Sequence, residues 1–181
     1  MLVVECDAQL PVAEARRGDP AAWDALFKRY QLPLYAYVFE LVRHEQTCLD
    51  IVQETFINAT RYLGSLRNDQ RFGSWLFAIA HQKCIQQWRK PKRDEVPWED
   101  PLDELVGAEA GPADMMIRQE QEAELMARVA ELPLAQRSVL LLHFIEGFSL
   151  EEIAHVTQAH VGTVKSRLHY AKRALRELLK P

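Results

Sequence analysis

Apolar positions recur at spacings of three and four along most of this chain, and strand-like alternation is nearly absent. In the first half, Asp19 and Pro20 mark the start of a helix, and Pro33 is expected to kink or break it. A second helix is predicted over residues 45–63 and a third, rich in aromatic residues, over residues 72–89. The apolar stripe predicted for the helix over 45–63 consists of Leu49, Val52, Phe56, Ala59 and Leu63.

The second half shows the same helical spacing with sharper boundaries. Helices are predicted over residues 114–132 and 133–146. Ser149 followed by Glu152 matches a capping box, in which each side chain accepts a hydrogen bond from the other residue's free backbone N–H. The short helix that it begins is followed by a turn over 157–160 and a final helix. The buried stripe predicted for the final helix consists of Val161, Val164, Leu168, Ala171, Leu175 and Leu178.

A segment of different composition separates the two helical halves. Residues 91–114 contain four prolines and two glycines, and residues 94–124 contain eleven acidic residues and one basic residue, a net charge of −10. That composition is typical of an extended linker with little core. The predicted fold is therefore all-α, with two small helical domains joined by an extended acidic linker. The expected boundaries are 1–92, 93–119 and 120–181.

Composition excludes several classes of protein. With 181 residues, of which 48% are hydrophobic, the chain is globular, and no apolar run approaches the length that spans a bilayer. The start lacks the pattern of a secretory signal, and the three cysteines form no metal-binding spacing, so we expect a cytoplasmic protein without membrane insertion. No nucleotide-binding loop, nucleophile elbow or zinc-protease motif is present. We therefore predict no enzymatic activity, no catalytic residues, no metal and no cofactor.

The last two helices have the pattern of a helix-turn-helix. A short capped helix, a tight turn and a longer basic helix are the elements that place a second helix in the DNA major groove. Residues 160–181 carry six Lys or Arg and one acid. A solvated amphipathic helix that closes a bundle would also be charged on one face. The cap, the short turn and the restriction of positive charge to the second helix favour DNA binding.

The same segments resemble region 4 of extracytoplasmic-function sigma factors, the subunits that direct bacterial RNA polymerase to promoters. The resemblance lies in residues 132–137, 148–154 and 161–168, and it implies that the last helix contacts the −35 promoter element and that this domain meets the polymerase β flap. Two positions depart from the family: Gln158 replaces a usual glycine in the turn, and Tyr170 replaces a frequent basic residue. The −35 contacts that the resemblance implies are Lys165, Ser166, Arg167, His169, Tyr170, Lys172 and Arg173.

Residues 50–56 resemble region 2.2 of the same family, the segment that binds core RNA polymerase. Helical spacing places four of the neighbouring side chains on one face, which gives a mixed acidic and apolar patch. A solvated face is the ordinary interpretation of an isolated acidic set, but the order of residues matches the family here. The resemblance implies that the polymerase β′ clamp contacts Asp50, Gln53, Glu54 and Ile57.

Residues 72–80 resemble regions 2.3 and 2.4, which hold the melted −10 strand. Such a site needs cations for the backbone and polar edges or a platform for an unstacked base. Trp75 is expected to act mainly in packing, and Gln82 and Gln86 replace a usual asparagine and a frequent aspartate. The −10 contacts that the resemblance implies are Arg67, Asn68, Asp69, Arg71, His81, Gln82, Lys83, Gln86 and Arg89.

Together these resemblances imply a sigma factor that binds core RNA polymerase and directs promoter-specific initiation, with duplex −35 DNA and single-stranded −10 DNA as partners. An anti-sigma factor is a further candidate partner. Two alternatives stay open. A sigma-like decoy would bind an anti-sigma factor but lose its DNA-facing charge, and the basic last helix argues against it. A helix-turn-helix regulator that does not replace sigma would lack the motifs at 50–56 and 72–80.

Overall fold

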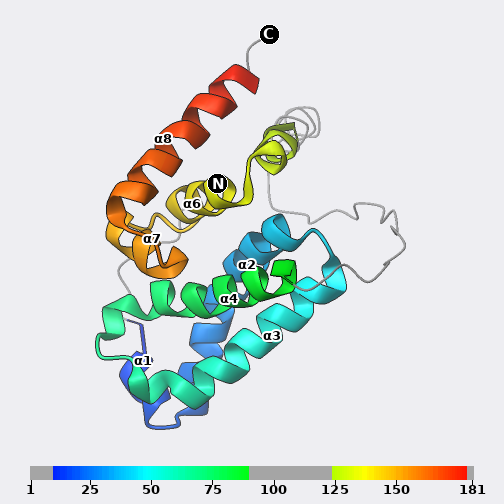
Figure 1. Ribbon diagram of the computed structural model, residues 1–181. Helices are drawn as coiled ribbons and strands as arrows, with labels where there is room; N and C mark the ends of the chain where they lie inside the picture. Colours follow the sequence, from blue (N-terminus) through cyan, green and yellow to red (C-terminus); the bar gives the residue numbers. More distant parts are fainter. Residues whose placement is uncertain (1–9, 90–123, 179–181) are drawn as a thin grey trace, which may run out of the picture.

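The computed structural model describes residues 10–89 and 124–178, and within them all regular structure is helical (Figure 1). The prediction of an all-α fold is confirmed. The N-terminal group, residues 10–89, contains α1 (Val12–Arg16), α2 (Pro20–Val42), α3 (Glu45–Tyr62) and α4 (Phe72–Arg89), with short 3₁₀ helices η1 (Leu63–Ser65) and η2 (Asp69–Arg71) before α4. The C-terminal group, residues 124–178, contains a helical segment over 124–131, then α6 (Leu134–Phe144), α7 (Leu150–Thr157) and α8 (Val161–Leu178).

Helix α2 begins as predicted but does not break. The Asp19 carboxylate accepts a hydrogen bond from the Ala21 backbone N–H at 2.9 Å, and Pro20 occupies the first turn, where its missing N–H is not needed. Of the two outcomes expected at Pro33, a kink or a break, the break does not occur, because α2 continues to Val42. Only one helical hydrogen-bond donor is lost at Pro33, and buried residues on both sides of it pack into the core.

Helix α3 has the predicted extent, but its buried face differs from the predicted stripe. Leu49 is 46% exposed, whereas Cys48, Ile51 and Thr55 are buried. The helix packs against both α2 and α4, so it buries a face that is turned relative to the predicted one. Thr55 is tolerated there because its hydroxyl donates to the Ile51 carbonyl oxygen of the same helix at 2.6 Å.

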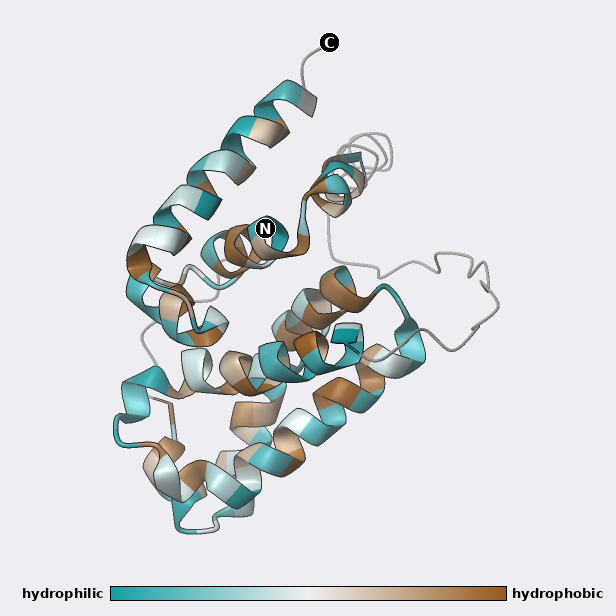
Figure 2. Ribbon diagram, viewed as in Figure 1, coloured by the Kyte–Doolittle hydropathy of each residue, from teal (hydrophilic) through white to brown (hydrophobic). Residues whose placement is uncertain are grey.

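The two helical groups pack directly on each other. Helix α7 lies across α4, α6 lies against α2, and a single hydrophobic core runs through both groups (Figures 1 and 2). At the junction, the ring of Phe148 meets the ring of Phe77 edge-on, with centroids 5.4 Å apart. A guanidinium nitrogen of Arg137 also donates to the Glu40 carbonyl oxygen at 2.9 Å. The linker prediction for residues 93–119 lies outside the described residues.

Candidate nucleic-acid and polymerase interfaces

The helix-turn-helix is built as its sequence indicates. The Ser149 backbone N–H donates to the Glu152 carboxylate at 2.9 Å, and the Glu152 backbone N–H donates to the Ser149 hydroxyl at 3.3 Å, so the predicted capping box is confirmed. Helix α7 ends at Gln158, whose backbone is left-handed, with φ 50° and ψ 42°. The turn therefore has the geometry that favours glycine, although a glutamine adopts it.

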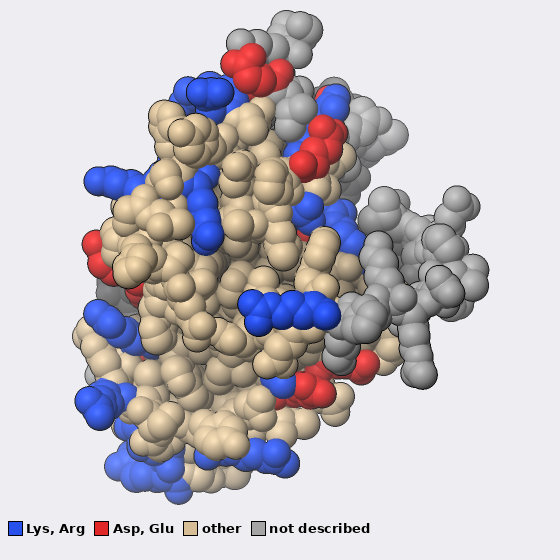
Figure 3. Space-filling view, in the orientation of Figure 1, with Lys and Arg blue, Asp and Glu red and all other residues tan. Residues whose placement is uncertain are grey.

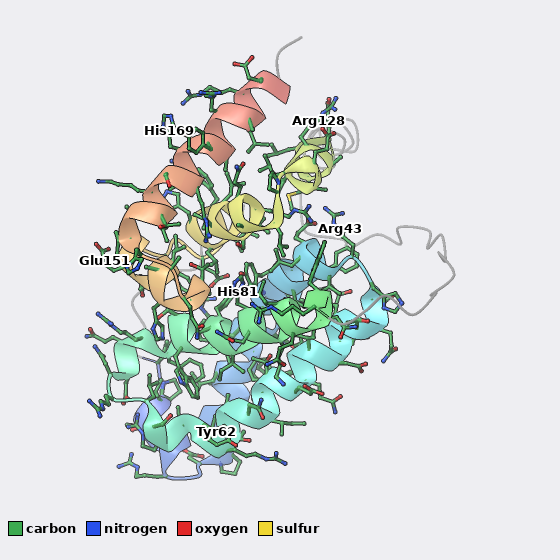
Figure 4. The ribbon with its side chains drawn as sticks, viewed as in Figure 1. Arg43, Tyr62, His81, Arg128, Glu151 and His169 are labelled. Carbon is green, nitrogen blue, oxygen red and sulfur yellow. The ribbon has the colours of Figure 1, made fainter. Side chains whose placement is uncertain are left out.

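Helix α8 presents one face to the core and the opposite face to solvent. Val164 and Ala171 are fully buried and Leu168 is nearly so, whereas Val161 is 37% exposed, so the buried stripe begins one turn later than predicted. His169 points outward from α8, and Lys and Arg side chains lie along the outer side of this helix (Figures 3 and 4). The predicted −35 residues on the exposed face are Lys165, Ser166, His169, Tyr170 and Arg173.

Arg167 and Lys172 lie at the edges of that face. Both are half-buried. The Lys172 ammonium lies 5.2 Å from the centroid of the Phe144 ring, so it interacts with α6. Arg167 lies toward the N-terminal group, because its charge contributes to the pKa of His81 on α4. In this arrangement, these two cations are engaged with neighbouring helices of the protein, and their predicted contact with DNA stays a prediction.

Tyr170 belongs to a small aromatic and cationic cluster on the exposed face. The phenol ring is 53% exposed. The His169 ring meets it at a steep angle with centroids 5.7 Å apart, and the Arg173 guanidinium lies 5.9 Å from its centroid. The cluster combines a hydroxyl, an imidazole and a guanidinium, which together can donate to base edges and contact phosphate.

The loop between α3 and α4 borders a pocket of about 290 Å³. Arg67, Asn68 and Arg71 are exposed there, and half-buried Trp75 packs against Phe72 with ring centroids 5.9 Å apart. Trp75 therefore combines the predicted packing role with a place in the pocket wall. The residues that line the pocket are Ser65, Leu66, Arg67, Asn68, Arg71, Trp75 and, from α7, His155.

His81 is the predicted −10 residue that solvent reaches least. It is 7% exposed and lies between α4 and the C-terminal group (Figure 4), and its Nδ1 forms a hydrogen bond with the Tyr37 hydroxyl at 2.7 Å. Burial, with a smaller effect from the charge of Arg167, lowers the pKa of His81 to about 4, so the imidazole is neutral at pH 7. The sequence places His81 on a polar face but does not reveal that other helices cover it.

The remaining predicted −10 residues of α4 are more accessible. Gln86 and Arg89 are exposed, and Gln82 and Lys83 are half-buried. The Lys83 ammonium lies 2.6 Å from the Glu54 carboxylate on α3. This ion pair joins a residue predicted to bind DNA to a residue predicted to bind polymerase.

The predicted polymerase-binding residues form a continuous exposed face on α3. Asp50, Gln53 and Glu54 are exposed, and Ile57 is 41% exposed. Leu49 adds a second exposed apolar side chain next to Asp50. The structure therefore presents a mixed acidic and apolar surface of the kind that protein partners cover.

The sequence did not indicate the polar contacts between the two helical groups. The buried Glu40 carboxylate forms an ion pair with Arg43, and Arg137 from the C-terminal group lies close enough to oppose the rise in the pKa of Glu40 that burial causes. Burial also raises the pKa of Glu146 to about 7, although the positive charge of Arg29 on α2 acts in the opposite direction. Helical periodicity relates residues three or four positions apart, so it gives no information about contacts between residues about a hundred positions apart. Arg137 was identified only as part of the region 4 resemblance.

Two other kinds of site are absent from residues 10–89 and 124–178. This part of the chain has no group of three or more His, Cys, Asp or Glu side chains that could hold a metal ion. None of its helices is long and apolar enough to cross a membrane.

Comparison with known proteins assigns the two helical groups. Residues 26–94 match the sigma-70 region 2 family, and residues 122–175 match the sigma-70 region 4 family. The RNA polymerase sigma-H factor of Pseudomonas aeruginosa is 36% identical over 100% of this chain and 97% of its own. The sigma-E factor of Escherichia coli K12, an extracytoplasmic-function RNA polymerase sigma factor by name, is 31% identical to this chain; the alignment covers 96% of this chain and 94% of the relative. The chain belongs to the extracytoplasmic-function family of RNA polymerase sigma factors.

Solved structures support the fold of this sigma factor. CnrH, in complex with the cytosolic domain of CnrY, is 24% identical to this chain, with a TM-score of 0.68. The alignment covers 94% of this chain and 96% of the CnrH chain. RpoE of Bartonella quintana, in complex with the anti-sigma factor NepR, is 23% identical to this chain, with a TM-score of 0.62. The alignment covers 85% of this chain and 96% of the RpoE chain. As a member of the family, the protein binds core RNA polymerase and directs promoter-specific initiation of transcription.

Proposed function

We propose that the two helical groups divide promoter recognition between them. The domain over 1–92 binds core polymerase and captures the −10 strand, the domain over 120–181 binds the −35 duplex, and the acidic segment 93–119 joins them. The protein acts in the cytoplasm, where core polymerase is found, and it has no catalytic activity of its own.

The observation that carries this proposal is the exposed face of α8. Lys165, His169 and Arg173 follow one another at spacings of four on a helix whose opposite face is buried in a capped helix-turn-helix. That arrangement leaves cations and base-reading groups free to enter a major groove while the core holds the helix in place. Ser166 and Tyr170 lie on the same face and provide hydroxyl groups for contacts with base edges.

The polymerase contact is assigned to the exposed face of α3. Asp50 and Gln53 present polar groups beside Ile57, whose apolar side chain a partner can bury. The −10 strand is assigned to the loop over 66–71 and to the accessible end of α4. Arg67, Arg71 and Arg89 supply positive charge there for the single-strand backbone.

Run-off transcription with purified core polymerase and a library of promoter fragments tests this proposal. The full chain should produce specific transcripts. Lys165→Ala should reduce selection of the −35 element, and Asp50→Lys should reduce core binding. Asp24→Lys, an exposed charge change on α2, is the matched control and should leave both properties unchanged. Core binding without transcripts would favour a sigma-like decoy, and duplex binding without core binding would favour an independent regulator.

An anti-sigma protein is a further proposed partner. Two solved relatives with the same fold are described in complex with CnrY and with the anti-sigma factor NepR. A candidate anti-sigma protein, titrated into the run-off reaction, should abolish transcripts at a stoichiometry of about one to one. Unchanged transcription after a complex has formed would contradict this role for that candidate.

A further inference from the structure

The loop before α4 is held in shape by a residue that lies outside it. Arg16, at the end of α1, donates to the Leu66 carbonyl oxygen at 3.0 Å and forms an ion pair with the Asp69 carboxylate. Its second terminal nitrogen lies 3.4 Å from the other oxygen of Asp69. A single guanidinium thus ties together two points of the loop that are three residues apart.

Bonds within the loop complete its shape and leave its cations exposed. The Asn68 side-chain oxygen accepts from the Gln70 backbone N–H at 3.0 Å, and the Arg71 backbone N–H donates to the Asn68 carbonyl oxygen at 3.0 Å. Arg67 and Arg71 line the pocket that the loop borders. The groups that shape the loop are therefore largely different from the cations that it presents.

We propose that Arg16 is a positioning residue for capture of the −10 strand, an inference that rests on the function proposed for this loop. A planar guanidinium can bind a carboxylate and a carbonyl oxygen in a fixed relative geometry, which the single ammonium of lysine does not reproduce. A loop that is already ordered loses less conformational entropy when the strand binds. Arg16 lies before residue 26, where the match to sigma region 2 begins, so that match does not assign it a role.

The side chains of this ion pair are 33% and 38% exposed, so the pair contributes little to global stability. Its removal should instead show in promoter opening. For Arg16→Gln we expect a loss of about three- to tenfold in the rate of promoter opening, from the loss of charged hydrogen bonds at a partly exposed site. The opening rate of Arg16→Lys should lie between that of the wild-type chain and that of Arg16→Gln.

The experiment uses holoenzyme assembled from core polymerase and the full chain, on a promoter that the wild-type chain selects from a random-sequence library. Permanganate reactivity of unpaired thymines measures opening, and fluorescence anisotropy measures core binding. Arg17→Gln is the matched control, because Arg17 is the next residue and its side chain, which pairs with Glu14, is 73% exposed. It should leave opening unchanged.

Slower opening with unchanged core affinity and unchanged melting temperature would support the positioning role. Normal opening by Arg16→Gln would overturn it, and so would a loss that follows a general loss of folded protein or core binding. If the wild-type chain itself opens no promoter, the proposed function fails instead, so the two failures are distinguishable.

Discussion

Replacing Gln158 by glycine should stabilise the protein without changing its contacts with DNA. Gln158 ends α7 with φ 50° and ψ 42°, and its backbone N–H donates to the Ala154 and His155 carbonyl oxygens. A residue with a Cβ pays about 1–2 kcal/mol to adopt this left-handed conformation. Glycine adopts it freely, but the greater freedom of glycine in the unfolded chain offsets about 0.4–1 kcal/mol of that gain.

From the midpoints of these ranges, the net effect of Gln158→Gly is a gain of about 0.8 kcal/mol in the free energy of unfolding, and the ranges themselves span about 0–1.6 kcal/mol. For a chain of this size, the melting temperature should rise by about 1–4 °C. Thermal unfolding followed by circular dichroism measures this change, and gel shift on a −35 duplex measures DNA affinity. Because Gln158 is exposed and lies before the first residue of α8, DNA affinity should stay the same.

Arg43 provides an informative comparison. It is also left-handed, with φ 55°, but its side chain forms an ion pair with buried Glu40. Arg43→Gly should therefore fail to stabilise the protein, since the backbone gain is offset by a buried carboxylate that loses its partner. A glycine at 158 that lowers the melting temperature, or that weakens DNA binding, would refute the left-handed turn.

Three further predictions follow from caps, titration and charge. Ser149→Ala should lower the free energy of unfolding, measured by urea denaturation, by about 1 kcal/mol, because the capping box loses its hydroxyl. Ser149→Thr keeps a hydroxyl and should retain most of the stability that the cap contributes. Because burial raises the pKa of Glu146 to about 7 from an ordinary value near 4.5, its contribution to stability is fully present below about pH 4.5 and is lost as the pH rises through 7. Glu146→Gln should therefore flatten the dependence of melting temperature on pH between about 4.5 and 7, and an unchanged slope would contradict this assignment. Lys165→Ala should weaken binding to a −35 duplex and make the slope of log affinity against log salt concentration shallower by about one. An unchanged slope would exclude a phosphate contact by Lys165.

Local features of the fold could be predicted from the sequence because they depend on residues close together in the chain. The N-cap at Asp19, the capping box at Ser149 and the extents of α3 and α4 all follow from short-range rules, and the structure confirms them. Pro33 shows where such a rule fails. Tertiary packing around α2 outweighs the loss of one hydrogen bond, and the helix continues.

Contacts between the two helical groups could not be predicted in the same way. The partners Arg137 and Glu40 are 97 residues apart, with the acidic segment between them. The sequence suggested a polar side of α4 for His81, but the structure buries His81 on the same face as Phe77 and Cys84. Periodicity gives no information about which helix from the other half covers that face. The accessibility of a candidate site therefore depends on tertiary contacts that short-range patterns do not encode.

The two departures from the family pattern in the helix-turn-helix differ in their physical consequences. Gln158 occupies a position where the backbone alone matters, and it adopts the left-handed geometry that a glycine would have, so the angle between α7 and α8 does not require the usual residue. Tyr170 occupies a position where the side chain matters, because its ring is 53% exposed and lies beside His169 and Arg173. A basic residue there would add a charge that attracts any phosphate, whereas a phenol adds a ring and one hydroxyl, which can contact a thymine methyl group or a base edge. Any difference in −35 preference from other family members should therefore lie at the base pairs nearest Tyr170, while the docking of α8 in the groove stays the same.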